Sequence, residues 1–98
     1  MRMLLKVQPS VEAGNEAVRS GRIAEIIQSS IQLIDPEAVY FVVENGGRTG
    51  FMFFNLEDSS QIPVIVEPLF QNLNANVEVL PAMNLEELQR GLSQMSGS

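Results

Sequence analysis

The stretch AVYFVVENGGRTGFMFFN, from Ala38 to Asn55, constrains the fold of this chain more than any other. Its two apolar runs are rich in β-branched and aromatic residues, which favour β-strands. Between them, Asn45-Gly46 and Gly46-Gly47 both suit the positive φ angles of a tight hairpin turn. The stretch is therefore predicted to form a β-hairpin with one of these dipeptides at its centre. Phosphate-binding glycine loops instead lead into a helix, so that role is disfavoured here.

Both faces of the predicted hairpin are apolar. With either turn, one face carries Val39, Phe41, Val43, Met52 and Phe54. The opposite face carries Tyr40, Val42, Glu44, Thr49, Phe51 and Phe53. An antiparallel sheet with one face in water normally alternates apolar and polar residues along each strand. Because this hairpin lacks that alternation, we expect helices to cover one face and a second copy of the protein to cover the other.

The remaining elements follow from hydrophobic periodicity and from helix-capping residues. The predicted order is a strand at 1–8, a loop at 10–14, a helix at 15–34, the hairpin, a helix capped by Ser59 or Ser60, a strand at 75–81 and a short helix from Asn84. Pro68 lies within the second long helix and is expected to kink or divide it, because proline removes an internal hydrogen bond.

This order predicts one domain over residues 1–98, with a frayed tail at about 96–98. The fold class is α+β: a ferredoxin-like βαββαβ unit plus a C-terminal helix, with four antiparallel strands in the order 4-1-3-2. The face without helices would carry Arg2, Leu4, Lys6, Tyr40, Val42, Phe51, Phe53, Asn76, Glu78 and Leu80. Covering its large apolar side chains is worth on the order of 10 kcal/mol. We therefore expect a homodimer formed through this sheet face.

Composition excludes several classes of function. The chain has 12 acidic and 6 basic residues, a formal charge of −6, which disfavours binding to nucleic acid. Without cysteine or histidine it lacks a thiolate nucleophile, a disulfide, and the commonest zinc ligand, haem ligand and general base. No apolar run approaches the roughly 20 residues of a membrane span. We expect a cytoplasmic protein that uses no cofactor, metal ion, nucleic acid or membrane.

The element order from Met1 to Ala82 resembles the dimeric α+β barrels, a ferredoxin-like superfamily. The segments LLKVQP, AVYFVV, RTGFMFFNLED and NVEVLPAM also resemble a small uncharacterised bacterial group with this fold. The superfamily includes muconolactone isomerases, antibiotic-biosynthesis monooxygenases and haem-degrading oxygenases. The resemblance thus implies a homodimer with a cavity for an apolar organic molecule, with cofactor-independent isomerisation or oxygenation as candidate reactions. The haem-degrading members use a haem-ligating histidine, which this sequence lacks.

The face without helices supplies the candidate site, an apolar surface with a few convergent polar groups. Its apolar members are Val42, Phe51 and Phe53. Its polar members are Arg2, Lys6, Tyr40, Glu44 and Glu78. Tyr40 is a candidate hydrogen-bond donor to a carbonyl or phenol, and Glu44 or Glu78 is a candidate base if burial raises its pKa. Whether the protein is an enzyme is left open.

Each candidate also has a simpler structural interpretation. Arg2 or Lys6 can form a cross-strand ion pair with Glu78. Glu44 and Arg48 can form a solvated pair beside the turn. Packing at a dimer interface is the alternative for the aromatic side chains Tyr40, Phe51 and Phe53. The competing function is a non-catalytic dimeric binding or assembly module. A cavity above about 300 Å³ with Tyr40 or Glu78 pointing into it favours a ligand, whereas tight packing favours assembly.

Overall fold

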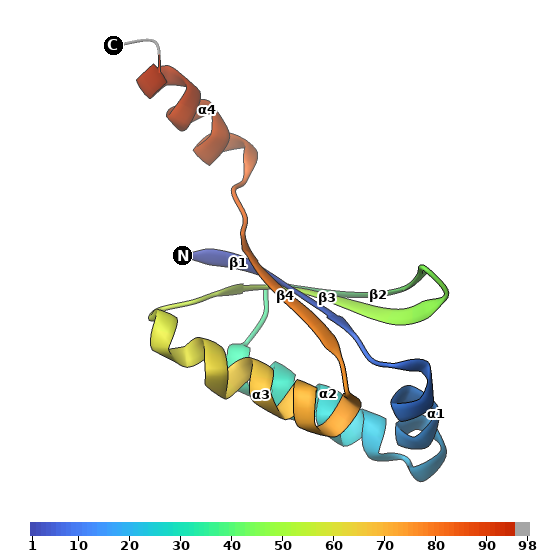
Figure 1. Ribbon diagram of the computed structural model, residues 1–98. Helices are drawn as coiled ribbons and strands as arrows, with labels where there is room; N and C mark the ends of the chain where they lie inside the picture. The colour runs from blue at the N-terminus through green and yellow to red at the C-terminus, as the bar shows by residue number, and fades with distance from the viewer. Residues whose placement is uncertain (96–98) are drawn as a thin grey trace.

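The computed structural model describes residues 1–95, so the predicted frayed tail at 96–98 lies outside the described residues. The elements are β1 (Arg2–Gln8), α1 (Val11–Ser20), α2 (Arg22–Ile34), β2 (Ala38–Glu44), β3 (Gly47–Asn55), the short 3-10 helix η1 (Ser59–Gln61), α3 (Ile62–Leu73), β4 (Asn76–Pro81) and α4 (Leu85–Met95). Helices α1, α2 and α3 lie on one side of the sheet, and α4 projects from the end of β4 on the other side (Figure 1).

Within residues 1–95 the strands form a four-stranded antiparallel sheet in the order β2-β3-β1-β4. Read from the other edge this is 4-1-3-2, so the predicted ferredoxin-like α+β fold is confirmed. The hairpin pairs Glu44 with Gly47, which places Asn45 and Gly46 at the turn. Their φ angles of 51° and 76° are both left-handed, as a two-residue hairpin turn of type I′ requires. The first of the two turn placements is therefore correct.

The hydrophobic core lies between the sheet and helices α2 and α3. Alternation along β1 directs Met3, Leu5 and Val7 to this side, where Met52 and Phe54 of β3 lie beside them. Leu5, in a central strand, has an exposed fraction of 0%. The helical and loop residues buried against these strands are Ala17, Ile34, Leu56, Ile65, Val66, Leu69 and Leu73. The opposite side of the sheet, which we call the open face, is not covered by these helices.

The first helical region differs from the prediction of one helix at 15–34. The hydroxyl of Ser10 accepts a hydrogen bond from the Ala13 amide at 3.1 Å, so helix α1 begins at Val11 in place of the predicted loop. Gly21 then adopts a left-handed φ of 81°, and its amide donates to the carbonyl of Val18. This cap ends α1 and turns the chain into α2. A serine cap and a glycine cap are local backbone features that the apolar stripe alone does not specify.

Replacing Gly21 with alanine is expected to lower the free energy of unfolding by about 1 kcal/mol, because a Cβ disfavours the left-handed conformation. No atom lies within 4 Å of the position that this Cβ would take, so the loss reflects backbone strain and not a clash. Urea denaturation measures the change. Gly21→Asn is the matched control, since asparagine tolerates this conformation and should lose less. Equal losses for the two variants would contradict the strain argument.

Helix α3 continues from Ile62 to Leu73 with Pro68 inside it, so Pro68 does not divide the helix, while the alternative of a kink stays a prediction. The helix buries Ile65, Val66, Leu69 and Leu73 against the sheet, and such packing outweighs one lost backbone hydrogen bond. The predicted serine cap is also replaced. The carboxylate of Asp58 accepts a hydrogen bond from the Ser60 amide at 3.2 Å and starts η1, which leads into α3.

Candidate functional site

The charged candidates on the open face pair with one another. Nε of Arg2 donates to Glu37 at 2.8 Å, and Arg2 also pairs with Glu87 of the α4 first turn. These two contacts, the Glu37 hydrogen bond first, raise the pKa of Arg2. Arg2 at the start of β1, Glu37 just before β2 and Glu87 in the first turn of α4 therefore lie next to one another. Arg2 thus links β1 to the start of α4 and to Glu37.

Lys6 holds the two carboxylates that the sequence suggests as bases. Its ammonium lies 2.9 Å from Glu44 Oε2 and 3.7 Å from Glu78 Oε2. The hydrogen bond with Glu44 is the largest cause of the raised pKa of Lys6. The alternative of a cross-strand ion pair with Glu78 is thus confirmed for Lys6. The expected Glu44–Arg48 pair is wrong, because Glu44 turns to Lys6 on the open face while Arg48 lies on the other side of the sheet.

The apolar candidates form an exposed surface around these ion pairs. Tyr40 is 63% exposed, Val42 is also exposed, and Phe51 and Phe53 are half-buried beside them. The Lys6 ammonium lies 5.8 Å from the centre of the Phe51 ring, within the range of a cation–π contact. The structure therefore brings the predicted residues together on one face of the sheet.

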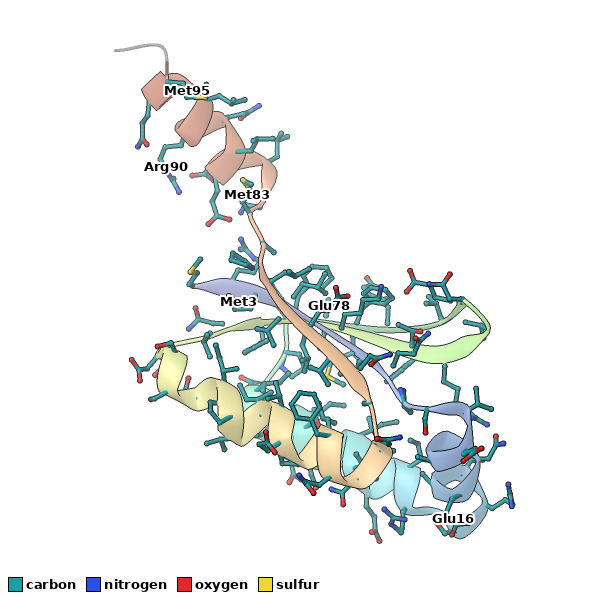
Figure 2. All side chains as sticks on the ribbon, viewed as in Figure 1. Met3, Glu16, Glu78, Met83, Arg90 and Met95 are labelled. Atoms are coloured by element: carbon teal, nitrogen blue, oxygen red, sulfur yellow. The ribbon has the colours of Figure 1, made fainter. Side chains whose placement is uncertain are left out.

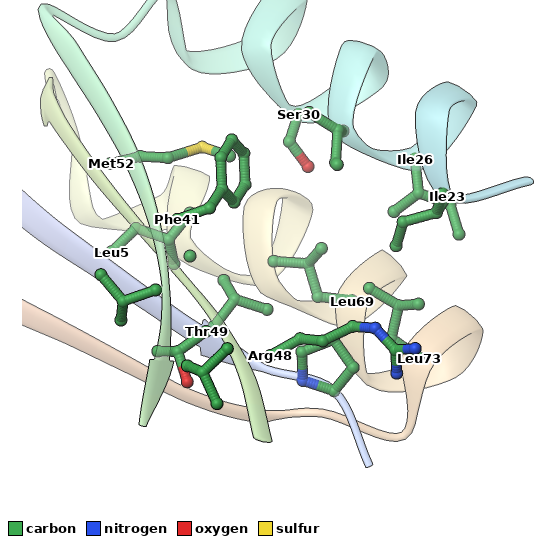
Figure 3. Close-up of a pocket in the computed structure, with 16 residues that line it drawn as sticks. Leu5, Ile23, Ile26, Ser30, Phe41, Arg48, Thr49, Met52, Leu69 and Leu73 are labelled. Carbon is green, nitrogen blue, oxygen red and sulfur yellow. The ribbon is translucent and has the colours of Figure 1, made fainter. Parts of the chain in front are cut away.

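A cavity of about 450 Å³ lies on the opposite, helix-covered side of the sheet, where strands β2 and β3 face α2 and α3. Among the predicted site residues, only Val42 lines it. Figure 3 shows Phe41 and Met52 on the strand side, with Ile23, Ile26 and Leu69 on the helices. The remaining lining residues are Leu5, Val7, Pro9, Ile27, Ser30, Val43, Arg48, Thr49, Gly50 and Leu73. The wall is almost entirely apolar.

The cavity exists because the helices do not cover the outer strand of the hairpin. Phe41 and Val43 point to the helix side of β2, yet they are 58% and 81% exposed. Gly50 stands opposite Phe41 in the ladder, and a Cβ at Gly50 would lie 3.3 Å from the Phe41 ring. The missing side chain lets this ring lie across β3, beside the opening. Helix cover of the hairpin face, expected from the sequence, is therefore only partial.

One cation lies at the edge of this apolar cavity. Arg48 enters from β3, and its Nη2 donates to Oδ1 of Asn15 on α1 at 3.1 Å. A Cβ at Gly14 would lie 2.7 Å from Nη1 of Arg48, so the glycine allows the guanidinium to approach α1 closely. Among residues 1–95, Arg48 makes no ion pair with a carboxylate, and no carboxylate lines the cavity. The guanidinium is thus positioned but not neutralised.

Two other residues, Thr49 and Ser30, bring polar side chains to the cavity wall. Thr49 is buried, receives a hydrogen bond from Gln8 Nε2 at 3.1 Å and donates to the carbonyl of Gly47 at 3.2 Å. Gln8 Nε2 also donates to the carbonyl of Glu44 at 2.7 Å, which fixes the hairpin to β1. Ser30 of α2 supplies a hydroxyl to the lining. None of these groups is a strong base, so the wall is suited to binding more than to proton transfer.

Comparisons with known proteins identified no relative of this chain. No protein-family model, curated protein or solved structure matches this chain. Within residues 1–95 no cluster of acidic side chains is arranged to hold a metal ion. No helix in the same part of the chain has the length and apolar character needed to cross a membrane.

Sequence reasoning missed this cavity because its lining residues look like ordinary core. Hydrophobic periodicity predicts that the apolar residues of the helix at 15–34 are buried, and the strand pattern predicts that Phe41 is covered. One signal was available: Arg48 shares the face of Gly50 and Met52 in the hairpin register. A cation on a face that is otherwise apolar marks a position where the face meets either solvent or an anion.

Proposed function

We propose that the protein binds a small apolar or aromatic organic molecule in the cavity between the hairpin and helices α2 and α3. The observation that carries this proposal is the volume of about 450 Å³ behind an almost wholly apolar wall. Small-molecule sites commonly have this size and character. The proposal moves the ligand from the open face, where the sequence suggested it, to the helix side of the sheet. Val42 is shared by the two surfaces.

Arg48 supports a narrower class of ligand, an apolar body with one anionic end such as a carboxylate. A guanidinium offers two parallel donors to a carboxylate, and hydrogen bonds between charged groups are the stronger ones. The chain carries a formal charge of −6, which repels anions over long distances. Preference for an anion must therefore come from a local contact, and Arg48 is the cation at this cavity.

Binding without catalysis fits the cavity better than cofactor-independent isomerisation or oxygenation. Tyr40, Glu44 and Glu78 lie on the open face, across the sheet from the cavity, and the two carboxylates are paired with Lys6. A reaction in the cavity would thus depend on a substrate that reacts with little help from side chains. The dimeric α+β barrel remains our proposal for the assembled form, with carrier or sensor activity as its role.

Replacing Arg48 with glutamine is expected to weaken binding of phenylalkanoic acids by about tenfold to a hundredfold, the usual worth of a hydrogen bond to a charged group. The corresponding uncharged amides should bind the two proteins equally. Isothermal titration calorimetry with matched acid and amide pairs measures both effects. Arg90→Gln removes the same charge on α4, far from the cavity, and should leave all affinities unchanged (Figure 2).

Two results would contradict this proposal in different ways. If Arg48→Gln bound the acids with unchanged affinity, the proposal that the ligand carries an anionic group would be contradicted. Failure of every acid and amide to bind, or binding that Ile26→Trp leaves unchanged, would remove the cavity as a binding site. Ile26 lines the cavity from α2, so a tryptophan there fills it.

A second function, assembly through the open face, is favoured by a separate observation. Tyr40, Val42 and Leu80 are exposed there, next to the half-buried rings of Phe51 and Phe53. Contiguous apolar surface of this kind marks an interaction site. A two-fold pairing with a second copy covers the same surface on both chains at once. The two proposals are compatible, because the ligand and the second copy use opposite faces of the sheet.

A further inference from the structure

Helix α4 projects from the body of the protein instead of packing on its own sheet (Figures 1 and 2). The described chain extends 57 Å in its longest dimension and only 18 Å in its shortest. α4 spans the eleven residues from Leu85 to Met95. Isolated helices shorter than about 12 to 15 residues are marginal in water. A helix of this length therefore needs a surface to pack against.

The start of α4 is fixed in its outward direction. The Ala82 amide donates to the carbonyl of Arg2 at 3.0 Å, which extends the β1–β4 ladder up to the helix. Asn84 and Glu87 then exchange hydrogen bonds at 2.8 Å each, forming a capping box. Glu87 also pairs with Arg2 on the open face. The two contacts with Arg2 hold the start of α4 in this direction, whereas the capping box is internal to the helix.

One side of α4 is apolar and exposed. Leu85, Leu88 and Met95 lie three and seven residues apart, so they share one side of the helix, and all three are exposed. Met83, just before the helix, is exposed as well. Helix α4 lies on the same side of the sheet as the open face (Figure 1). The chain thus presents two apolar surfaces on one side that its own fold keeps apart.

We infer that α4 is an exchanged arm, which lies against the open face of a second copy of this chain. A two-fold axis that brings two open faces together also brings each α4 to the side where the other copy's apolar surface lies. Each pairing then covers two helices and two sheet surfaces with contacts that a single chain cannot make. This inference rests on the proposed assembly through the open face and adds the element that completes it.

Leu88→Glu tests the arm and is expected to raise the dissociation constant of the dimer at least tenfold in sedimentation equilibrium. Gln94→Glu is the matched control, because Gln94 is exposed on α4 on the side away from the stripe and should change the constant less than twofold. Leu88 is exposed in the single chain, so its replacement leaves the sheet and helices α1 to α3 folded, and circular dichroism should lose at most the helical signal of α4.

Isotope-filtered NMR on a mixture of labelled and unlabelled chains then locates the contact. The inference predicts intermolecular NOEs from the methyl groups of Leu88 and Met95 to the rings of Phe51 and Phe53. A dimer that Leu88→Glu does not weaken would overturn the arm while leaving the sheet pairing intact. NOEs to the Phe41 ring would overturn the placement on the open face. A monomer at every concentration would overturn both the arm and the pairing.

Discussion

Replacing Phe53 with glutamate is expected to raise the dissociation constant of the dimer by about a thousandfold or more. Phe53 lies near the middle of the open face, paired with Leu4 of β1 on one side and Ala38 of β2 on the other. Central aromatic residues carry much of the energy of an interface, and a buried unpaired charge costs several kcal/mol. Two-fold symmetry places the substitution twice in each dimer, so the loss is doubled.

Val43→Glu provides the matched control for Phe53→Glu. Val43 is also an apolar strand residue of the hairpin and is more exposed, but it points to the helix side of β2. Sedimentation equilibrium should show a Val43→Glu dimer of unchanged affinity and a Phe53→Glu monomer that is still folded by circular dichroism. Equal effects of the two substitutions, or a wild-type protein that is monomeric at micromolar concentration, would contradict pairing through the open face.

Replacing Leu5 with alanine is expected to lower the free energy of unfolding by about 3 to 5 kcal/mol. Leu5 is fully buried in central strand β1, between Met52 of β3 and Val79 of β4. Both neighbouring strands are held by ladder hydrogen bonds, so they cannot move inward to fill the space. A small domain has about 5 to 15 kcal/mol of net stability in total, and this single change would remove much of it.

Urea denaturation at one fixed protein concentration measures the effect of Leu5→Ala, because the proposed dimerisation would contribute to the apparent stability. Val64→Ala is the control. Val64 lies on α3 but is exposed, and a substitution there should change stability by less than about 0.5 kcal/mol. A loss below about 1 kcal/mol for Leu5→Ala would mean that the space beside β1 collapses, and that the core is not packed as the structure describes.

The fold could be predicted from the sequence because its strongest signals are periodic. The hairpin from Ala38 to Asn55 predicted two strands and the residues on each of their faces, whereas the choice between its two turn placements came from the structure. The alternation in β1 and β4 predicted which side faces the helices. The start of α1 and the break at Gly21 were missed because each depends on one hydrogen bond or one φ angle. Such local features leave no periodic trace.

The cavity lies on the opposite side of the sheet from most of the predicted site residues, and the sequence did not indicate it for a different reason. Polar residues on an otherwise apolar face are typical of a ligand site, and this pattern pointed to Lys6, Glu44 and Glu78. In the structure, Lys6 forms ion pairs with both carboxylates. The cavity arises because α2 and α3 leave the outer strand β2 partly uncovered, as the exposure of Phe41 shows. Sequence periodicity gives the face of each strand, but not how far a helix reaches across the sheet.

Methyl NMR during titration with a phenylalkanoic acid tests most directly whether the two faces of the sheet have different partners. Three residues that line the cavity, Ile26, Met52 and Leu69, are expected to show methyl signals that shift as the acid is added. The signals of Leu4 and Leu80 on the open face should stay in place. Shifts at Leu4 and Leu80 with unchanged signals from the cavity would contradict the account.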